Sequence, residues 1–179
     1  MKTRTGTLSL SSCALMSALL CVCAQLMIPF PGVPVNMALF AVHLAALLLG
    51  PGRAAASTLV YLALGACGAP VFAGFASGPA ALLGPTGGFL LSYPLCALLT
   101  GFLSRHESCS ALRAFAAALA GTLACGFIGI SWFMFNTGAV PSEAFFLWWL
   151  TYLPGDLLKI LLAVMLWRRL RAPLRRIGL

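Results

Sequence analysis

The chain has 179 residues, of which 61% are hydrophobic and only 8% are charged. Soluble domains carry about 25% charged residues, so this composition excludes an ordinary soluble protein and indicates an integral membrane protein, with all 179 residues in one domain. The 11 lysines and arginines outnumber three acidic residues. They lie in the termini and short connections, where they fit a membrane orientation signal better than a nucleic-acid surface, and no nucleic-acid partner is expected.

The first apolar segment, residues 8–28, is long enough to cross a membrane as a helix. It would span about 31 Å, whereas the apolar region of a cleaved signal peptide is shorter. The segment carries Ala14 and Ala18, and small residues four apart let another helix approach closely. This pair could pack inside the protein or dock on a separate partner subunit, and the residues alone leave both alternatives open.

Three further helices are predicted before residue 104, at residues 35–49, 54–67 and 89–103. The first follows a proline-rich turn at 29–36 and contains His43, which we interpret as a hydrogen-bonded core residue rather than a ligand. The first two are short for complete spans. A re-entrant hairpin would bury Arg53 at high cost, so two tilted spans are favoured over the hairpin.

Residues 68–88 form an uncharged segment rich in glycine and proline. Solvated loops are normally polar, so this loop is expected to pack against other protein or a ligand, as a lid would. The alternative is an unpacked interfacial loop. The packed interpretation is favoured because five large apolar side chains need burial: Val71, Phe72, Phe75, Leu82 and Leu83.

The last two helices are predicted at residues 111–135 and 154–170, with Ser110 as the N-cap of the first. An aromatic segment at 144–152 suits a membrane interface, and five arginines close the chain. The basic residues then fall on one side of the membrane. The positive-inside rule predicts an all-α membrane protein with six transmembrane helices and both termini in the cytoplasm, as a multi-pass protein of the inner (plasma) membrane.

Asp156 and Lys159 open the last helix, just after Pro154, which suits a first helical turn. Residues three apart share a helix face, and charges inside a membrane helix are read as a functional site by default. The alternative is a pair that only neutralises itself. As a binding site, Asp156 would accept from ligand N–H groups and Lys159 would donate to a carbonyl or carboxylate, while Phe72, Phe75 and Tyr152 cover an apolar ligand.

Catalytic motifs are absent from the sequence: there is no P-loop, HExxH, G-x-S-x-G or paired-cysteine zinc spacing. The sequence has seven cysteines, which is an odd number, and contains no C-x-x-C motif. Neither an enzyme nor a cofactor or metal site is therefore expected.

Two motifs resemble a known family. Leu83-Gly-Pro-Thr-Gly-Gly-Phe-Leu90 and Leu153-Pro-Gly-Asp-Leu-Leu-Lys159 are similar to segments of the BioY-type, biotin-specific S components of energy-coupling-factor (ECF) vitamin transporters. The resemblance covers essentially residues 8–170. Weaker matches support it: Pro34-Val, Leu49-Gly-Pro-Gly52 and the stretch Tyr61 to Gly74.

The resemblance implies a six-helix S-component fold that captures biotin from the outer face. It implies partners as well, namely a transmembrane coupling subunit that docks on Ala14 and Ala18 and two ATPase subunits that drive uptake. The expected ligand-binding residues are Asp156, Lys159, Asn36, Phe72, Gly84, Thr86, Gly87 and Tyr152.

The chain departs from the family pattern at three positions. Asn36 stands for a common threonine, Ala38 for a glutamine and Phe89 for a tyrosine. Asn36 keeps the ability to form hydrogen bonds, whereas a contact made by the glutamine and a hydroxyl contact made by the tyrosine are expected to be absent here. Two rival functions remain, an S component for another small vitamin and a non-transport membrane scaffold or channel. The scaffold predicts no saturable ligand binding.

Overall fold

The computed structural model describes residues 2–28, 35–105, 109–140, 142, 146 and 152–177. The regular elements of this part of the chain are helices and one pair of two-residue strands, so the predicted all-α class is confirmed. The α-helices are α1 (Lys2–Gln25), α2 (Ala38–Leu49), α3 (Pro51–Ala66), α4 (Gly78–Leu83), α5 (Gly87–Ser104), α6 (Ala111–Thr137) and α8 (Leu153–Ile177), and a 3₁₀ helix, η1, covers Ala73–Phe75.

The observed helices overlap all six predicted ones but differ at some boundaries. The first ends at Gln25 rather than residue 28, because Met27–Ile28 (β1) pairs antiparallel with Val35–Asn36 (β2). This pairing also delays α2 from residue 35 to Ala38. The predicted loop 68–88 contains η1 and α4, and the last helix continues to Ile177 rather than 170.

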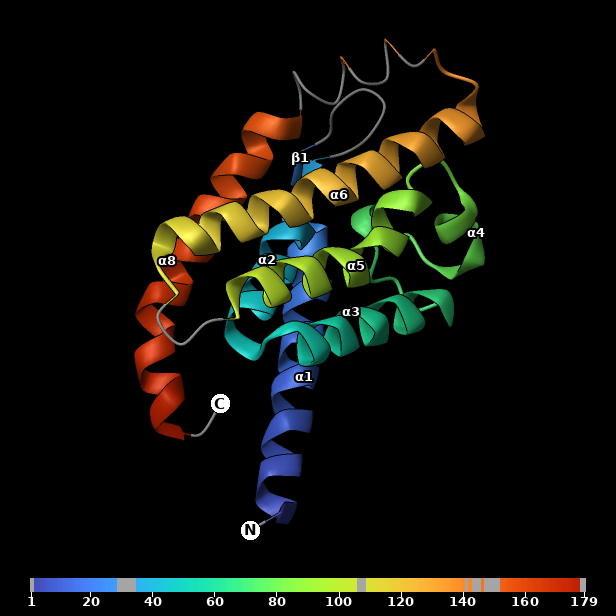
Figure 1. The fold of residues 1–179 in the computed structure, drawn as a ribbon. Helices are drawn as coiled ribbons and strands as arrows, with labels where there is room; N and C mark the ends of the chain where they lie inside the picture. Colours follow the sequence, from blue (N-terminus) through green and yellow to red (C-terminus); the bar gives the residue numbers. More distant parts are fainter. Residues whose placement is uncertain are drawn as a thin grey trace.

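The long helices form a bundle in which α1 and α8 lie on different sides of the remaining helices (Figure 1). The α5 helix packs along α6 and against α3, α2 packs against α8, and α1 packs against α3. The start of α1 and the end of α8 lie at the same end of the molecule, and the first half of α1 projects beyond the other helices there (Figure 1).

Three helices are long and apolar enough to cross a membrane among the residues that the structure describes. They are Thr7–Gln25 within α1, Gly87–Ser104 and Ala111–Thr137. The α2 helix is apolar but shorter. The predicted cap of α6 is confirmed, since the Arg113 N–H donates to the Ser110 hydroxyl over 3.2 Å.

The segment between α3 and α5 is only partly packed. Phe72 is fully buried, and Val71 and Leu82 pack against the main core. Phe75 and Leu83, in contrast, are 70% and 65% exposed. The packed interpretation is therefore right for the first three side chains and wrong for the last two, because the short helices η1 and α4 turn those two outward.

Glycines allow the helices to approach closely. A Cβ atom on Gly101 of α5 would lie 2.6 Å from both the nitrogen and the Cα of Pro51, which opens α3. These are backbone atoms and cannot rotate away. Gly52, one residue further along α3, is exposed and has nothing within 4 Å of the corresponding position.

We predict that Gly101→Ala destabilises the protein by about 1–3 kcal/mol, as overpacking of a core does. Gly52→Ala is the matched control and should leave stability unchanged or raise it by up to ~1 kcal/mol, since alanine is the better helix former. Thermal unfolding in detergent measures both. Equal melting temperatures for the two variants would contradict the close approach of α5 to α3.

Candidate functional site

A buried ion pair lies in the first turns of α8. The Lys159 Nζ donates to Asp156 Oδ1 over 2.8 Å, and the two side chains are only 8% and 10% exposed. Their spacing of three residues puts both on one face of the helix. Within the described residues this is the one salt bridge, so the predicted pairing of the two charges is present.

The pair keeps hydrogen-bonding capacity. Among the described residues, Asp156 Oδ1 is engaged by Lys159, and Oδ2 has no hydrogen-bond partner. In the part of the chain that the structure describes, the Tyr61 hydroxyl is the buried side-chain oxygen that lacks a hydrogen-bond partner. Neither carboxylate oxygen of Asp156 belongs to that class. An ionised carboxylate accepts several hydrogen bonds and an ammonium donates three, so the pair can serve a ligand and still hold together.

The pair borders a cavity of about 140 Å³. At about 30 Å³ of liquid volume for each water molecule, this is space for roughly five water molecules or one small organic molecule. Most of its wall is apolar or aromatic, and α2, α5, α6, α8 and the segment between α3 and α5 all contribute. The lining residues are Asn36, Leu39, Phe72, Ala73, Ala76, Ala81, Thr86, Phe89, Leu90, Tyr93, Thr122, Cys125, Gly126, Tyr152, Asp156 and Lys159.

Six of the eight predicted ligand-binding residues lie in this wall. They come from four places distant in the sequence: Asn36, Phe72, Thr86, and the group Tyr152, Asp156 and Lys159. The fold thus brings together side chains that lie as far apart in the sequence as Asn36 and Lys159.

Gly84 and Gly87 do not line the cavity, and both have packing roles behind it. The Gly84 carbonyl accepts a hydrogen bond from Trp132 Nε1 over 2.9 Å. A Cβ on Gly87 would collide with the Leu82 carbonyl, so only glycine fits where α5 starts beneath α4. These glycines set the position of Thr86, which lies between them and does line the cavity.

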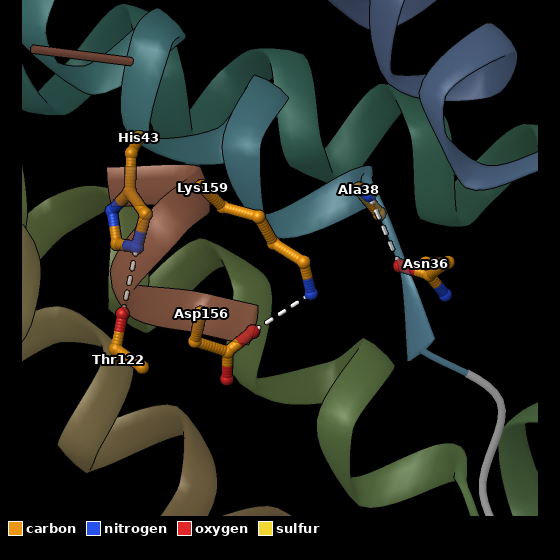
Figure 2. A network of polar contacts seen from close by, with 6 residues as sticks. All are labelled: Asn36, Ala38, His43, Thr122, Asp156 and Lys159. Atoms are coloured by element: carbon orange, nitrogen blue, oxygen red, sulfur yellow. Dashed lines mark hydrogen bonds and ion pairs between the residues drawn. The ribbon is translucent and has the colours of Figure 1, made fainter. Parts of the chain in front are cut away.

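Asn36 combines a structural contact with a place in the wall. Its Oδ1 accepts from the Ala38 N–H over 3.0 Å at the start of α2 (Figure 2), a local bond typical of asparagine before a helix. Ala38 itself is fully buried and absent from the cavity wall, so it offers the cavity no polar contact.

Phe72 is held in the wall by the core behind it. Its ring occupies the space that a side chain on Gly65 would need. Tyr61 packs against the same ring edge to face, with centroids 5.4 Å apart, and stacks on Tyr93, another wall residue, at 6.5 Å. An aromatic pair of this kind stabilises by about 0.5–1.5 kcal/mol beyond area burial.

Gln25, at the end of α1, fastens the turn that follows Phe72. Its Nε2 donates to the Phe72 carbonyl over 3.0 Å, and its Oε1 accepts from the Phe75 N–H over 3.1 Å. Gly74 and Phe75 both have positive φ, at 68° and 60°, and a bulky residue in that region is strained. The side chain of Gln25 therefore holds a strained turn over the cavity, which the sequence did not reveal.

His43 lies in α2 beside the ion pair, fully buried. Its Nδ1 is 3.2 Å from the Thr100 hydroxyl of α5, and its Nε2 is 2.8 Å from the Thr122 hydroxyl of α6. The interpretation as a hydrogen-bonded core histidine is confirmed. Figure 2 shows the imidazole, Thr122 and the Asp156–Lys159 pair gathered between the same helices.

Several wall residues were not among the predicted binding residues. Tyr93 and Leu90 follow the Gly-Pro-Thr-Gly-Gly motif on α5, and Thr122, Cys125 and Gly126 lie on α6. The available signal was the recurrence of small residues along α6, which lets that helix approach α5. Small residues indicate that two helices pack closely, but they do not distinguish residues that line a cavity from residues that contact the neighbouring helix.

The arrangement suits recognition of a small, mainly apolar molecule that carries both N–H donors and an oxygen acceptor. Aromatic rings surround the body of such a molecule, and one carboxylate and one ammonium group fix its polar end. Binding sites for small molecules have this character generally, with a few placed polar groups in an apolar cavity.

Comparisons with known proteins agree with this picture. The model of the BioY family matches residues 1–176. A probable biotin transporter BioY of Pyrococcus horikoshii is 38% identical over 158 residues, covering 88% of this chain and 93% of the relative. The biotin transporter BioY of Thermotoga maritima is 33% identical, with 87% and 90% covered.

The fold is similar to a crystal structure of the S-component for biotin from an ECF-type ABC transporter. The TM-score is 0.86 and the identity 28%, with 96% of this chain and 95% of the other covered. The relatives are transport proteins rather than enzymes, as the lack of catalytic motifs predicted. With the family model spanning nearly the whole chain, the protein belongs to the BioY family.

Proposed function

We propose that this protein is the biotin-binding S component of an ECF-type vitamin importer, and that Asp156 and Lys159 are its principal ligand contacts. The observation that supports the site most strongly is the buried ion pair facing a cavity with aromatic walls. The relatives are named as biotin transporters, and biotin has the mixed chemistry that such a cavity suits.

Biotin presents a ureido ring with two N–H donors and one carbonyl oxygen, an apolar thioether ring and a chain ending in a carboxylate. Asp156 accepts from the ureido N–H groups, and Lys159 donates to the ureido carbonyl or to the carboxylate. Phe72, Phe89 and Tyr93 enclose the ring system. Thr86, Tyr152 and Asn36 add polar contacts at the rim.

The partners in this proposal are a transmembrane coupling subunit and two ATPase subunits. The coupling subunit docks on α1, where Ala14 and Ala18 are both exposed. Ser17, on a neighbouring side of α1, is buried and donates to the Ser57 carbonyl of α3 over 2.8 Å. One side of the helix is thus bound to α3, while its exposed side presents Ala14 and Ala18 among larger apolar residues such as Leu15 and Val22, and the two small residues permit close approach.

Membrane placement follows the charge pattern: six spans, both termini cytoplasmic and the cavity reached from outside, in the plasma membrane. The two shorter helices α2 and α3 complete the six with α1, α5, α6 and α8. An S component for another small vitamin is the second candidate. Its chemistry would also need donors for Asp156 and acceptors for Lys159, so competition with unlabelled vitamins separates the two candidates.

We predict that Asp156→Asn weakens biotin binding by about 10- to 100-fold, the effect of losing a charge-assisted hydrogen bond of ~1.5–3 kcal/mol. Equilibrium binding of labelled biotin to the purified variant measures the loss, and its melting temperature shows whether it is folded. Glu107→Gln, the same exchange at another acidic residue of the sequence, is the control and should bind as wild type does. Wild-type affinity in a folded Asp156→Asn variant would refute the site assignment.

We also predict that Ala14→Trp and Ala18→Trp abolish assembly with the coupling subunit but leave biotin affinity within about twofold, because the indole prevents close helix approach. Ala116→Trp makes the same change at another exposed alanine, on α6, and should preserve both properties. Co-purification of the coupling subunit measures assembly. Retained assembly in the α1 variants would show that the coupling subunit docks elsewhere.

A further inference from the structure

A buried polar network of His43, Thr100 and Thr122 lies beside the ion pair. His43 bridges two threonines from different helices, and only one of them borders the cavity. Thr122 is in the cavity wall, whereas Thr100 is fully buried and outside it. Each hydroxyl can donate one hydrogen bond and accept two. The direction of each bond to the imidazole therefore decides whether the Thr122 hydroxyl offers a donor or only an acceptor to the cavity.

The surroundings of Thr100 favour one direction. Its hydroxyl lies where a Cβ on Gly121 would fall, in the tight contact between α5 and α6. Its neighbours there are His43 Nδ1 at 3.2 Å and the Cys96 thiol. Sulfur is a weak acceptor, and an unsatisfied buried O–H costs about 1–3 kcal/mol. The Thr100 hydroxyl therefore donates to Nδ1, which acts as an acceptor.

The opposite nitrogen of the ring must then carry the hydrogen, since a neutral imidazole has one donor and one acceptor. Nε2–H donates to the Thr122 oxygen over 2.8 Å. His43 is the partner that the structure gives the Thr122 hydroxyl, and no bond to a backbone carbonyl of α6 takes up its hydrogen among the described residues. The O–H of Thr122 is left to point into the cavity.

The position of this donor relates it to the ion pair. Lys159 is close enough to the imidazole to act on it electrostatically, and Figure 2 shows Thr122 on α6 opposite Asp156 on α8. A ureido carbonyl oxygen has two lone pairs. It can therefore accept from Lys159 and from Thr122 together while Asp156 accepts from the neighbouring N–H groups.

We propose that Thr122 donates a hydrogen bond to the ureido carbonyl oxygen of the ligand, and that His43 is the positioning residue that turns the Thr122 hydroxyl toward it. This inference rests on the proposed biotin-binding function. It adds a specificity-determining residue on α6 to the pair on α8, and it gives the buried histidine a role in recognition through its hydrogen bond.

Isosteric variants test the role of Thr122. Thr122→Val should weaken biotin binding by about tenfold, the effect of one lost hydrogen bond of ~1.4 kcal/mol, and Thr122→Ser should restore the affinity to within about threefold. Thr58→Val is the matched control. It removes a buried hydroxyl of α3 that bonds the Ala55 carbonyl and lies outside the cavity wall, so its loss should stay below about threefold. Thr122→Val with wild-type affinity would overturn the inference.

The role of His43 is tested by a double-mutant cycle. His43→Leu should weaken binding several-fold in the wild-type background and cause no further loss in the Thr122→Val background, because it acts through that hydroxyl. His43→Gln, which keeps one donor and one acceptor, should bind more tightly than His43→Leu. Losses that add in the double variant would refute the positioning role.

Isotope-edited infrared spectroscopy of bound biotin, labelled with ¹³C at the ureido carbonyl, identifies the ligand atom. At saturating ligand, the carbonyl stretch should move to higher frequency in Thr122→Val and stay at the wild-type frequency in Thr58→Val. An unchanged frequency in Thr122→Val would overturn the assignment to the carbonyl. Wild-type protein that binds no biotin would instead refute the proposed function, and this inference with it.

Discussion

The carboxylate of Asp156 and the ammonium group of Lys159 lie 2.8 Å apart on α8, in a chain with few other charges. Moving either ion alone out of water costs several kcal/mol, and a mutual contact offsets that cost only in part. The remaining hydrogen-bonding positions face a cavity rather than lipid or core. In the proposed function, a ligand with matching donors and acceptors supplies the missing contacts, and the pair that is costly to bury alone then recognises that ligand specifically.

The rest of the fold holds this pair beside a cavity of defined shape. Glycines permit the close approach of α5 to α3 and α6, and α5 and α6 both contribute residues to the cavity wall. The absent side chain at Gly65 makes room for the Phe72 ring, and Gln25 fastens the strained turn beyond it to α1. In the proposed complex, α1 also carries the docking face. One helix therefore contacts both the partner surface and the segment that closes the cavity.

Much of this organisation could be predicted from the sequence, because it depends on local signals. Apolar runs indicated the helices, Ser110 indicated a cap, and two charges in an apolar helix indicated the candidate site. The pairing of Met27–Ile28 with Val35–Asn36 could not be predicted, since each strand has only two residues and a proline-rich stretch of sequence separates them. The wall residues of α6 could not be predicted either. Thr122 and Cys125 differ from packing residues only in that they border the cavity instead of another helix. Gly84 and Gly87 were predicted as contacts from a motif, yet their backbone roles lie behind the wall.

The most direct test of the account is equilibrium binding of labelled biotin to the purified wild-type protein in detergent, with excess riboflavin, thiamine or unlabelled biotin as competitor. The account predicts saturable binding of about one molecule per chain, as expected for one cavity, displaced by biotin and by neither other vitamin. A folded sample that shows no saturable binding, or that releases the label to riboflavin or thiamine as readily as to biotin, would contradict it.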